Sequence, residues 1–561
     1  MARQALSTEQ RLIRAAMLFL LLGLLLKALS MPLATVHWDS NYYLNIGSNF
    51  IERGELTPYM WRLGADTNII AGSGTGYGVL ILTYWFKVFG LSLYSGYALM
   101  YIVGVLSLVV LYFLARDWWQ SRQAGIIAIV FTALSGAFIA QFYIRMDALG
   151  VLAYLLVLWL HLTAVRRQHN WLHFAVGVAI IVAVEVHIQT LLYIVAISFY
   201  YLLEYLRLLR RERRILLIRP SIFYFSGAFI AGVIYLFIHV FPDPEAYFII
   251  ARNCQNCTSA GIAKEIERYL IYIYGYSLDA FIFCLAIAIA WSRRSAPDKH
   301  FFTLLIGYLL GQAIISPPAQ IHYITHMIPL VGIGVGGIFH TTQESENGIT
   351  QRQLTMGLVG VSFLLVFQFI SVLGNSETDN QAPDNVAYVQ DYIASDTVVM
   401  GLPPLYHHLI EYDRFLSYRA GEQHGINLRD EDYMTFWERE QPQVFIGQAR
   451  EDDNLWWEYM NIHDFQQVRA DVWVAGDLLE TLIIDNPMPE ISFASTESSV
   501  LFGDCIVLEW SVLDADSITI NRVSENSSGM KEICPNTTTD YTLSAYWVGG
   551  IETETITTEV D

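Results

Sequence analysis

Charged residues are scarce in this sequence. Only 15% of the 561 residues are charged, whereas 54% are hydrophobic. A soluble chain of this length carries roughly a quarter charged residues, so the composition excludes an ordinary soluble protein. Apolar runs of about 20 residues, each long enough to span a bilayer core, recur from Met17 to Leu373. The first run, Leu12 to Leu33, lacks a small-residue cleavage pattern and is followed by further runs, so we interpret it as a membrane helix rather than a signal peptide.

Basic residues are rare in the C-terminal third. Residues 376–561 hold 35 Asp and Glu against 8 Lys and Arg, whereas residues 1–375 hold 18 against 25. Such an acidic segment argues against nucleic acid as a partner. The segment also lacks a nucleotide loop, a nucleophile elbow and a cluster of metal ligands. The glycine-rich stretch 72–78 lacks the lysine of a phosphate-binding loop, so we interpret it as a flexible loop.

The apolar runs predict eleven membrane spans. They lie at 12–32, 93–115, 124–142, 147–165, 171–186, 188–206, 217–240, 269–291, 301–316, 324–340 and 353–373. Basic residues concentrate in alternate loops, most densely between Arg207 and Arg219. Because Lys and Arg favour the cytoplasmic side, we expect a multi-pass plasma (inner) membrane protein with a cytoplasmic N-terminus and extracytoplasmic C-terminal domains.

The long loop 34–92 is then on the outer side. Its many Trp and Tyr residues are typical of the membrane interface. Within it, Gly78 to Phe89 is expected to form an amphipathic helix that lies on the outer surface rather than crossing the membrane.

The acidic segment divides into two expected domains. In residues 376–485, strand-like stretches at 397–402, 443–447 and 469–475 alternate with a helical pattern at 430–439, which indicates a small α/β domain. A proline-containing linker, Asn486 to Glu490, opens the last domain, 486–561. Its short alternating strands predict a β-sandwich. They are expected at 506–510, 517–520, 541–547 and 553–560.

Cysteine is also rare, with five residues in the chain. Cys505 and Cys534 lie in the segment expected outside, where a disulfide between them and two buried thiols are both compatible with the sequence. Cys254 and Cys257 form a C-x-x-C with no second pair, so a local disulfide or two thiols is favoured over zinc. Cys284 is interpreted as packing within a span.

Polar side chains capable of chemistry gather at the expected outer face. Asp39 follows the first span directly and is either a catalytic carboxylate or the cap of the next helix. Arg145 and Asp147 stand in the short connection between the third and fourth spans. Charges at the bilayer edge face a cavity or pair with one another, so a functional pair and a simple ion pair are both open.

Two further groups lie at the ends of spans. His322 and Tyr323, with His326 nearby, precede the tenth span and are either site residues or interfacial anchors. Glu185, His187 and Gln189 lie at the turn of the hairpin 171–206, where His187 is either a ligand-binding residue or a satisfied core histidine.

These features together resemble the GT-C class of membrane glycosyltransferases. An Asp directly after the first span, a long aromatic outer loop, an Arg-x-Asp after the third span and a Tyr-containing entry to a late span with Pro329 carry the resemblance. The nearest families are the protein O-mannosyltransferases and the lipid A aminoarabinose transferase. The mannosyltransferases have Asp-Glu in the first loop, whereas Ser40 follows Asp39 here. Residues 504–511 and 535–543 resemble bacterial Ig-like modules.

The resemblance implies a fold class and a reaction. It implies an α-helical, GT-C-like polytopic domain over 1–375, with the α/β domain and the Ig-like sandwich after it. The implied reaction is inverting transfer of a sugar from a polyprenyl-phosphate donor to a hydroxyl of a protein, lipid or cell-envelope glycan on the extracytoplasmic face. Nucleotide sugars are absent from that face, so the donor must arrive on a lipid.

The resemblance also gives each candidate residue a role. Asp39 is the expected base for the acceptor hydroxyl. Arg145 is expected to bind the donor phosphate, because its planar fork matches phosphate oxygens. Asp147 orients Arg145 or binds a divalent metal, which remains open because no cofactor is certain. His322 and Tyr323 are further candidates for contact with the phosphate or sugar, and His187 is a candidate donor-binding residue.

Two rival classes remain. A transporter or flippase of lipid-linked sugars is the main alternative, but it would show repeats with broken spans at matching positions, and we see no such pairing. A non-catalytic surface scaffold would need only one span as its anchor, which leaves the other expected spans unexplained.

Overall fold

The computed structural model separates into two compact units. The first comprises residues 1–58 and 63–378, and the second comprises 59–62 and 379–561. The structure describes residues 38–54, 76–135, 144–212, 219–241, 296–315, 326–343, 382–401, 403–412, 414–417, 433–447, 454–469 and 471–560, with isolated positions elsewhere.

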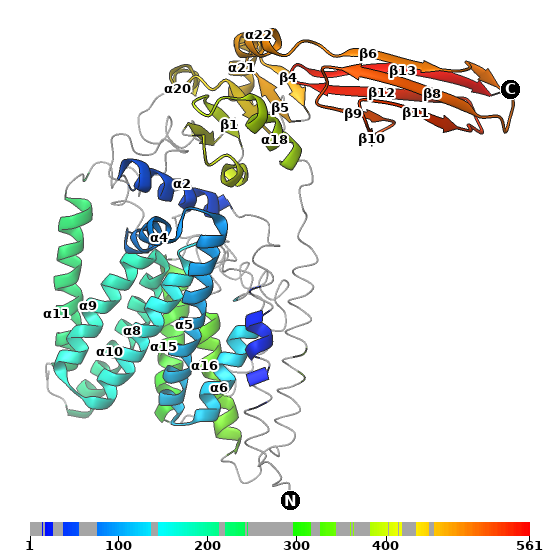
Figure 1. Cartoon of the computed structure of the whole chain (residues 1–561). Coiled ribbons are helices and arrows are strands. Elements are labelled where there is room, and N and C mark those ends of the chain that lie inside the picture. The colour runs from blue at the N-terminus through cyan, green and yellow to red at the C-terminus, as the bar shows by residue number, and fades with distance from the viewer. Residues whose placement is uncertain are drawn as a thin grey trace, which may run out of the picture. The chain divides into compact units, whose positions relative to one another are not determined.

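The first unit is helical (Figure 1). Its described helices are α2 (Trp38–Arg53), α4 (Gly76–Phe89), α5 (Leu93–Trp119), α6 (Arg122–Leu134), α8 (Asp147–Arg167), α9 (Asn170–Val186), α10 (Leu191–Glu212), α11 (Arg219–Tyr235), α15 (Ala296–Ile315) and α16 (Ile328–Gln343). A short 3-10 turn, η3 (Ile188–Thr190), joins α9 to α10, and a π-helical turn, η4 (Leu236–Val240), extends α11.

Several of these helices have the length and composition of membrane spans. Among the described residues, four helices are long and apolar enough to cross a bilayer, at Leu93–Trp119, Asp147–Arg167, Ile188–Arg207 and Arg219–Ile238. Shorter apolar helices lie at Gly76–Phe89, Arg122–Leu134, Asn170–Val186 and Ile328–Ile338. The predicted span 269–291 lies outside the described residues, as do 12–32 and 353–373 apart from isolated positions. The chain is a multi-pass membrane protein, and its number of spans stays a prediction.

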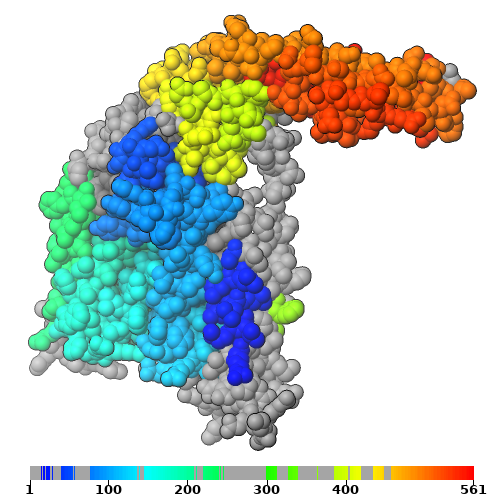
Figure 2. Space-filling view, in the orientation of Figure 1, coloured from blue at the N-terminus to red at the C-terminus, as the bar shows by residue number. Residues whose placement is uncertain are grey.

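Glycines allow the helices of the bundle to approach closely. A Cβ on Gly177 of α9 would stand 2.1 Å from the carbonyl oxygen of Tyr224, and one on Gly227 of α11 would stand 2.2 Å from that of Phe174. Small residues at such crossings permit the tight packing that joins helices in membranes. The other face of α11, at the edge of the view in Figure 2, exposes apolar side chains such as Phe229 and Ile230, which suits contact with lipid.

The predicted helix 78–89 is present as α4. It buries Val79, Leu82 and Phe86, spaced at helical intervals, and exposes Tyr84 and Val88 on the other side. The exposed side is mostly apolar as well, unlike the polar face that an amphipathic helix carries, and its position on the outer membrane surface stays a prediction.

The second unit begins with an α/β domain. Its mixed sheet has the order β2-β1-β3-β5-β4. The strands are β1 (Val399–Gly401), β2 (Phe415–Ser417), β3 (Val444–Ile446), β4 (Gln466–Arg469) and β5 (Val472–Val474), with helices α18 (Ala382–Tyr392), α20 (Tyr433–Glu440), α21 (Asn454–Ile462) and α22 (Gly476–Asp485) and the 3-10 turn η6 (Pro403–His408). β1 pairs in parallel with β2 and β3. The predicted strand 469–475 is two strands, because the chain turns at Asp471 with φ 65°.

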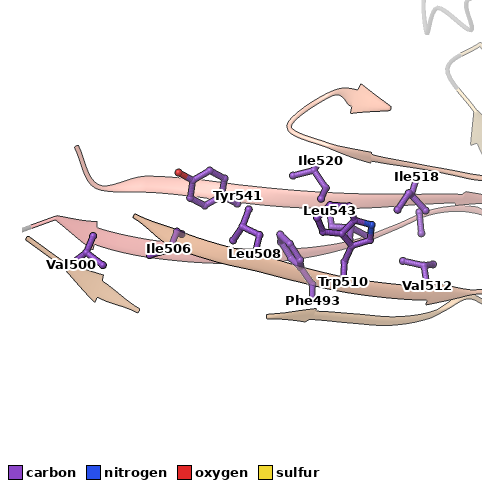
Figure 3. Packing of buried hydrophobic residues seen from close by; sticks show 11 residues of the cluster. Phe493, Val500, Ile506, Leu508, Trp510, Val512, Ile518, Ile520, Tyr541 and Leu543 are labelled. Atoms are coloured by element: carbon purple, nitrogen blue, oxygen red, sulfur yellow. The ribbon is translucent and has the colours of Figure 1, made fainter. Parts of the chain in front are cut away.

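The second unit ends in two sheets packed face to face (Figure 3). One sheet has the order β10-β9-β12-β13-β7 and the other β11-β8-β6. The strands are β6 (Glu490–Ser495), β7 (Ser499–Val500), β8 (Ile506–Leu513), β9 (Ser517–Ile520), β10 (Val523–Glu525), β11 (Ser528–Ile533), β12 (Thr539–Trp547) and β13 (Gly550–Val560). Alternate residues such as Leu508, Trp510 and Leu543 point into one core. A disulfide joins Cys505 to Cys534, at the ends of the paired strands β8 and β11.

The α/β domain and the sandwich are joined by more than the short connection at 486–489. Arg469 donates from Nη1 to the carbonyl oxygens of Trp547 at 2.9 Å and Gly550 at 2.7 Å. Its guanidinium lies 5.1 Å from the ring centre of Tyr388 and 5.4 Å from that of Tyr546. The Tyr388 hydroxyl donates to Val548 O at 2.6 Å, and burial raises the pKa of Tyr388, which keeps this donor protonated. These contacts fix the two domains of this unit to each other.

Candidate functional site

The candidate site begins where α8 begins. Arg145 and Asp147 are both buried, 9% and 2% exposed, and Arg145 Nε lies 2.8 Å from Asp147 Oδ2. Asp147 is the first residue of α8, where the positive end of the helix dipole stabilises a carboxylate. The two charges predicted at the bilayer edge are therefore paired inside the protein.

Two histidines from distant parts of the chain meet the same carboxylate. His326 Nε2 lies 3.2 Å from Asp147 Oδ1 and His187 Nε2 lies 3.7 Å from it. The imidazole rings stack at 5.0 Å between centroids with 23° between their planes. His187 stands between α9 and η3, and His326 stands just before α16. One carboxylate thus gathers side chains from three connections of the helical unit.

Local structure holds each histidine in place. His187 ends α9 and caps η3, because its Nδ1 accepts the backbone N–H of Gln189 at 3.2 Å. The carbonyl oxygen of His326 accepts from the Tyr193 hydroxyl at 2.7 Å. Gly150, one turn into α8, makes room for both rings, since a Cβ there would stand 2.7 Å from His187 Cβ and 3.1 Å from His326 Cε1.

The energetics of the cluster argue for a role beyond packing. Taking two charges out of water costs several kcal/mol per ion, and a buried pair is often no more stable than apolar residues of the same volume. Charged residues within membrane segments accordingly tend to mark functional sites. Here one guanidinium balances one carboxylate, and two imidazoles add hydrogen-bonding capacity next to them. By residue type, the guanidinium suits a phosphate, and the carboxylate and imidazoles are of the kinds that bind metal ions.

The same residues are the candidate metal ligands of the described part of the chain. One ligand atom each from Asp147, His187 and His326 lie within 4.8 Å of one another, and all three residues are buried. Two histidines and a carboxylate suit zinc or iron by ligand type.

The structure brings together three of the predicted site residues, Arg145, Asp147 and His187. It places Asp39 in α2, where the backbone is helical and the side chain lies outside the described residues. His322 and Tyr323 also lie outside them. His326 is a site residue that the sequence did not assign, although it stands in the stretch singled out for His322 and Tyr323. Its signal was a histidine just before an apolar helix.

Residues 77–242 match the family model described as dolichyl-phosphate-mannose-protein mannosyltransferase. None of the curated proteins matches the chain in sequence. Among solved structures, ArnT from Cupriavidus metallidurans bound to undecaprenyl phosphate is similar, with a TM-score of 0.58 and 15% identity over 82% of this chain and 98% of ArnT. The apo form of that ArnT gives the same TM-score and identity, over 83% of this chain. The chain resembles a GT-C class glycosyltransferase.

The range matched by the family model contains part of the candidate site. Arg145, Asp147 and His187 lie inside the matched range 77–242, and His326 lies outside it.

An oligosaccharyltransferase of Archaeoglobus fulgidus, tethered with an acceptor peptide by a disulfide bond, aligns with a TM-score of 0.49 and 11% identity over 76% of this chain and 68% of its own.

Proposed function

We propose that this protein is an inverting glycosyltransferase that moves a sugar from a polyprenyl-phosphate donor to a hydroxyl acceptor on the extracytoplasmic face. The observation that carries the proposal is Arg145, held by Asp147 at the buried start of α8 in an ArnT-like fold. A fixed guanidinium stabilises the negative charge of a departing phosphate. Undecaprenyl phosphate in the ArnT structure supports a lipid-linked donor.

The proposed chemistry is a single displacement. The acceptor hydroxyl oxygen attacks the anomeric carbon while the bond from that carbon to the phosphate oxygen breaks, and the polyprenyl phosphate leaves. The carboxylate of Asp39 takes the hydroxyl proton. Arg145 binds the phosphate and Asp147 orients Arg145. His322 and Tyr323 are proposed to contact the phosphate or sugar.

The parts of the chain have separate proposed roles. Residues 1–375 form the catalytic membrane domain, with the outer loop 34–92. Residues 376–485 form an extracytoplasmic α/β domain, and 486–561 form an Ig-like module. In this proposal the protein lies in the plasma (inner) membrane and its N-terminus is in the cytoplasm. The asymmetry of arginine between alternate loops supports it.

A transfer assay tests the proposal. Purified protein is incubated with a panel of polyprenyl-phosphate sugars and hydroxyl acceptors, and release of free polyprenyl phosphate is measured. We expect release with at least one sugar, and loss of release in Arg145→Ala. Translocation of the lipid-linked sugar across proteoliposomes without any release would instead identify a flippase.

A further inference from the structure

The ring of His187 is hydrogen-bonded at Nδ1 and faces a carboxylate at Nε2, and this decides where its proton lies. Nδ1 accepts the backbone N–H of Gln189 at 3.2 Å, so this nitrogen presents its lone pair. A neutral imidazole has one N–H, and a charged one has two. The cap therefore requires a neutral His187 with its proton on Nε2. That N–H faces Asp147 Oδ1 at 3.7 Å, an electrostatic contact just beyond hydrogen-bond distance.

His326 presents a proton to the same oxygen. An ionised carboxylate can only accept, so His326 Nε2, 3.2 Å from Asp147 Oδ1, is the donor. The Nδ1 atom of His326 is buried and has no hydrogen-bond partner among the described residues. Asp147 thus pairs with Arg145 through Oδ2, while Oδ1 accepts from His326 at 3.2 Å and faces His187 Nε2 at 3.7 Å. Every side chain of the cluster is directed at this one carboxylate.

We propose that His187 and His326 are positioning residues that fix Asp147, and through it Arg145, for binding the phosphate of a lipid-linked donor, in a cluster that holds no metal. The role of the phosphate rests on the proposed function. Neither histidine has to touch the substrate. Each restricts the carboxylate, and the carboxylate restricts the guanidinium, as hydrogen-bond partners behind metal ligands restrict those ligands.

The tautomer of His187 is the argument against a metal. A metal at Nε2 needs the lone pair of that nitrogen and a proton on Nδ1. That proton would face the backbone N–H of Gln189 and break the cap of η3. The spacing of Asp147, His187 and His326 would admit an ion, but the hydrogen bonding of His187 opposes one.

A substitution at Gly150 can displace the imidazole rings of His187 and His326 while every polar side chain of the cluster stays in the chain. The Cβ of an alanine at position 150 would lie 2.7 Å from His187 Cβ. Rotation of the His187 side chain does not move its own Cβ, so the clash can be relieved only by a shift of the backbone. Gly150→Ala is therefore expected to weaken binding of the lipid phosphate while Arg145, Asp147 and both histidines remain in the chain.

The test uses the purified full-length protein and polyprenyl phosphate as the probe. We expect His326→Leu to raise its Kd by about 10–100-fold, the range found when a supporting hydrogen-bond partner is removed. His326→Gln, whose amide N–H can still donate to Asp147, should recover most of the affinity. In Arg145→Lys protein, His326→Leu should add less than about threefold, because residues that act through one another are not additive. His173→Leu removes an equally buried histidine of α9 outside the site and serves as the control.

Three outcomes would overturn the proposal. The first is additivity of His326→Leu with Arg145→Lys, which would mean that His326 does not act through Arg145. The second is an equal loss of affinity in the His173→Leu control, which would reduce the effect to stability. The third is a stoichiometric metal that is lost with His187→Gln, measured by elemental analysis. Because Kd is read without turnover, a protein that binds the lipid phosphate but transfers no sugar refutes the proposed function and leaves this inference standing.

Discussion

Removal of Arg469 should weaken the contact between the α/β domain and the sandwich. Its guanidinium donates to two carbonyl oxygens of the β12–β13 turn and reaches Asp516 Oδ2 at 3.4 Å. Hydrogen bonds to charged groups contribute about 1.5–3 kcal/mol each. The two ring contacts add about 0.5–1 kcal/mol each, and the half-exposed ion pair adds about 0–1 kcal/mol.

These contributions share one side chain and are not additive, so we expect Arg469→Ala to weaken the docking of the two domains by about 3–5 kcal/mol. The contacts of Tyr388 with Val548 and of Tyr392 with Asp516 remain in the variant. The contact between the α/β domain and the sandwich should therefore open more often while both domains stay folded. Arg469→Lys should lose roughly half as much, because one ammonium cannot reach both carbonyls and lie flat between two rings.

Hydrogen exchange of the full-length protein measures this opening. A loss of 3 kcal/mol of docking free energy corresponds to amide exchange about 100-fold faster at residues that exchange only when the two domains separate. We expect this faster exchange in α18 and in residues 547–551. Cleavage in the connection 486–489 should rise in parallel. Arg522→Ala changes an exposed arginine of the sandwich and is the matched control. Unchanged exchange in Arg469→Ala, or an equal change in the control, would show that the domains are not held by this side chain.

Four further predictions concern chemistry, stability and topology. Asp39→Asn should lower the transfer rate by about two to four orders of magnitude with little change in Tm if Asp39 is the base; a stable variant with near-normal turnover would leave Asp39 only a structural role in the first turn of α2. Arg145→Lys should not restore transfer despite its charge, because a bidentate phosphate contact needs the guanidinium; normal turnover would leave only an ion pair. Replacing Cys505 and Cys534 together by Ser should cost about 3–4 kcal/mol for their separation of 29 residues, and an unchanged Tm of the sandwich would contradict this. Finally, Glu212→Cys should react with a membrane-impermeant reagent only after the cells are opened, and labelling of intact cells would invert the topology.

The sequence by itself determined the elements. Apolar runs at 93–115 and 147–165 predicted the helices found as α5 and α8, because backbone in a bilayer has to satisfy its own hydrogen bonds and a helix does so locally. Alternation at 517–520 and 541–547 predicted β9 and β12, because side chains of a strand point to opposite faces in turn. Short strands with weak alternation, such as β7 and β10, were not predicted.

Part of the candidate site could also be predicted. Arg145 and Asp147 stood out because two charges in so short a connection between apolar runs need a partner or a cavity. They are two residues apart, so their pairing is local. The positions of Arg145 and Asp147 in the chain therefore indicated both that the site is charged and that the two residues pair with each other.

The rest was decided by tertiary structure. His326 lies 179 residues from Asp147 and meets it only because helix packing brings the start of α16 to the start of α8. Gly150 admits both imidazoles, and the cap of η3 selects the tautomer of His187. Arg469 likewise meets Trp547 and Gly550 only when the two domains are docked. Sequence periodicity reports which face of an element is apolar, whereas these contacts depend on how rigid elements approach one another, and that is set by close packing throughout the fold.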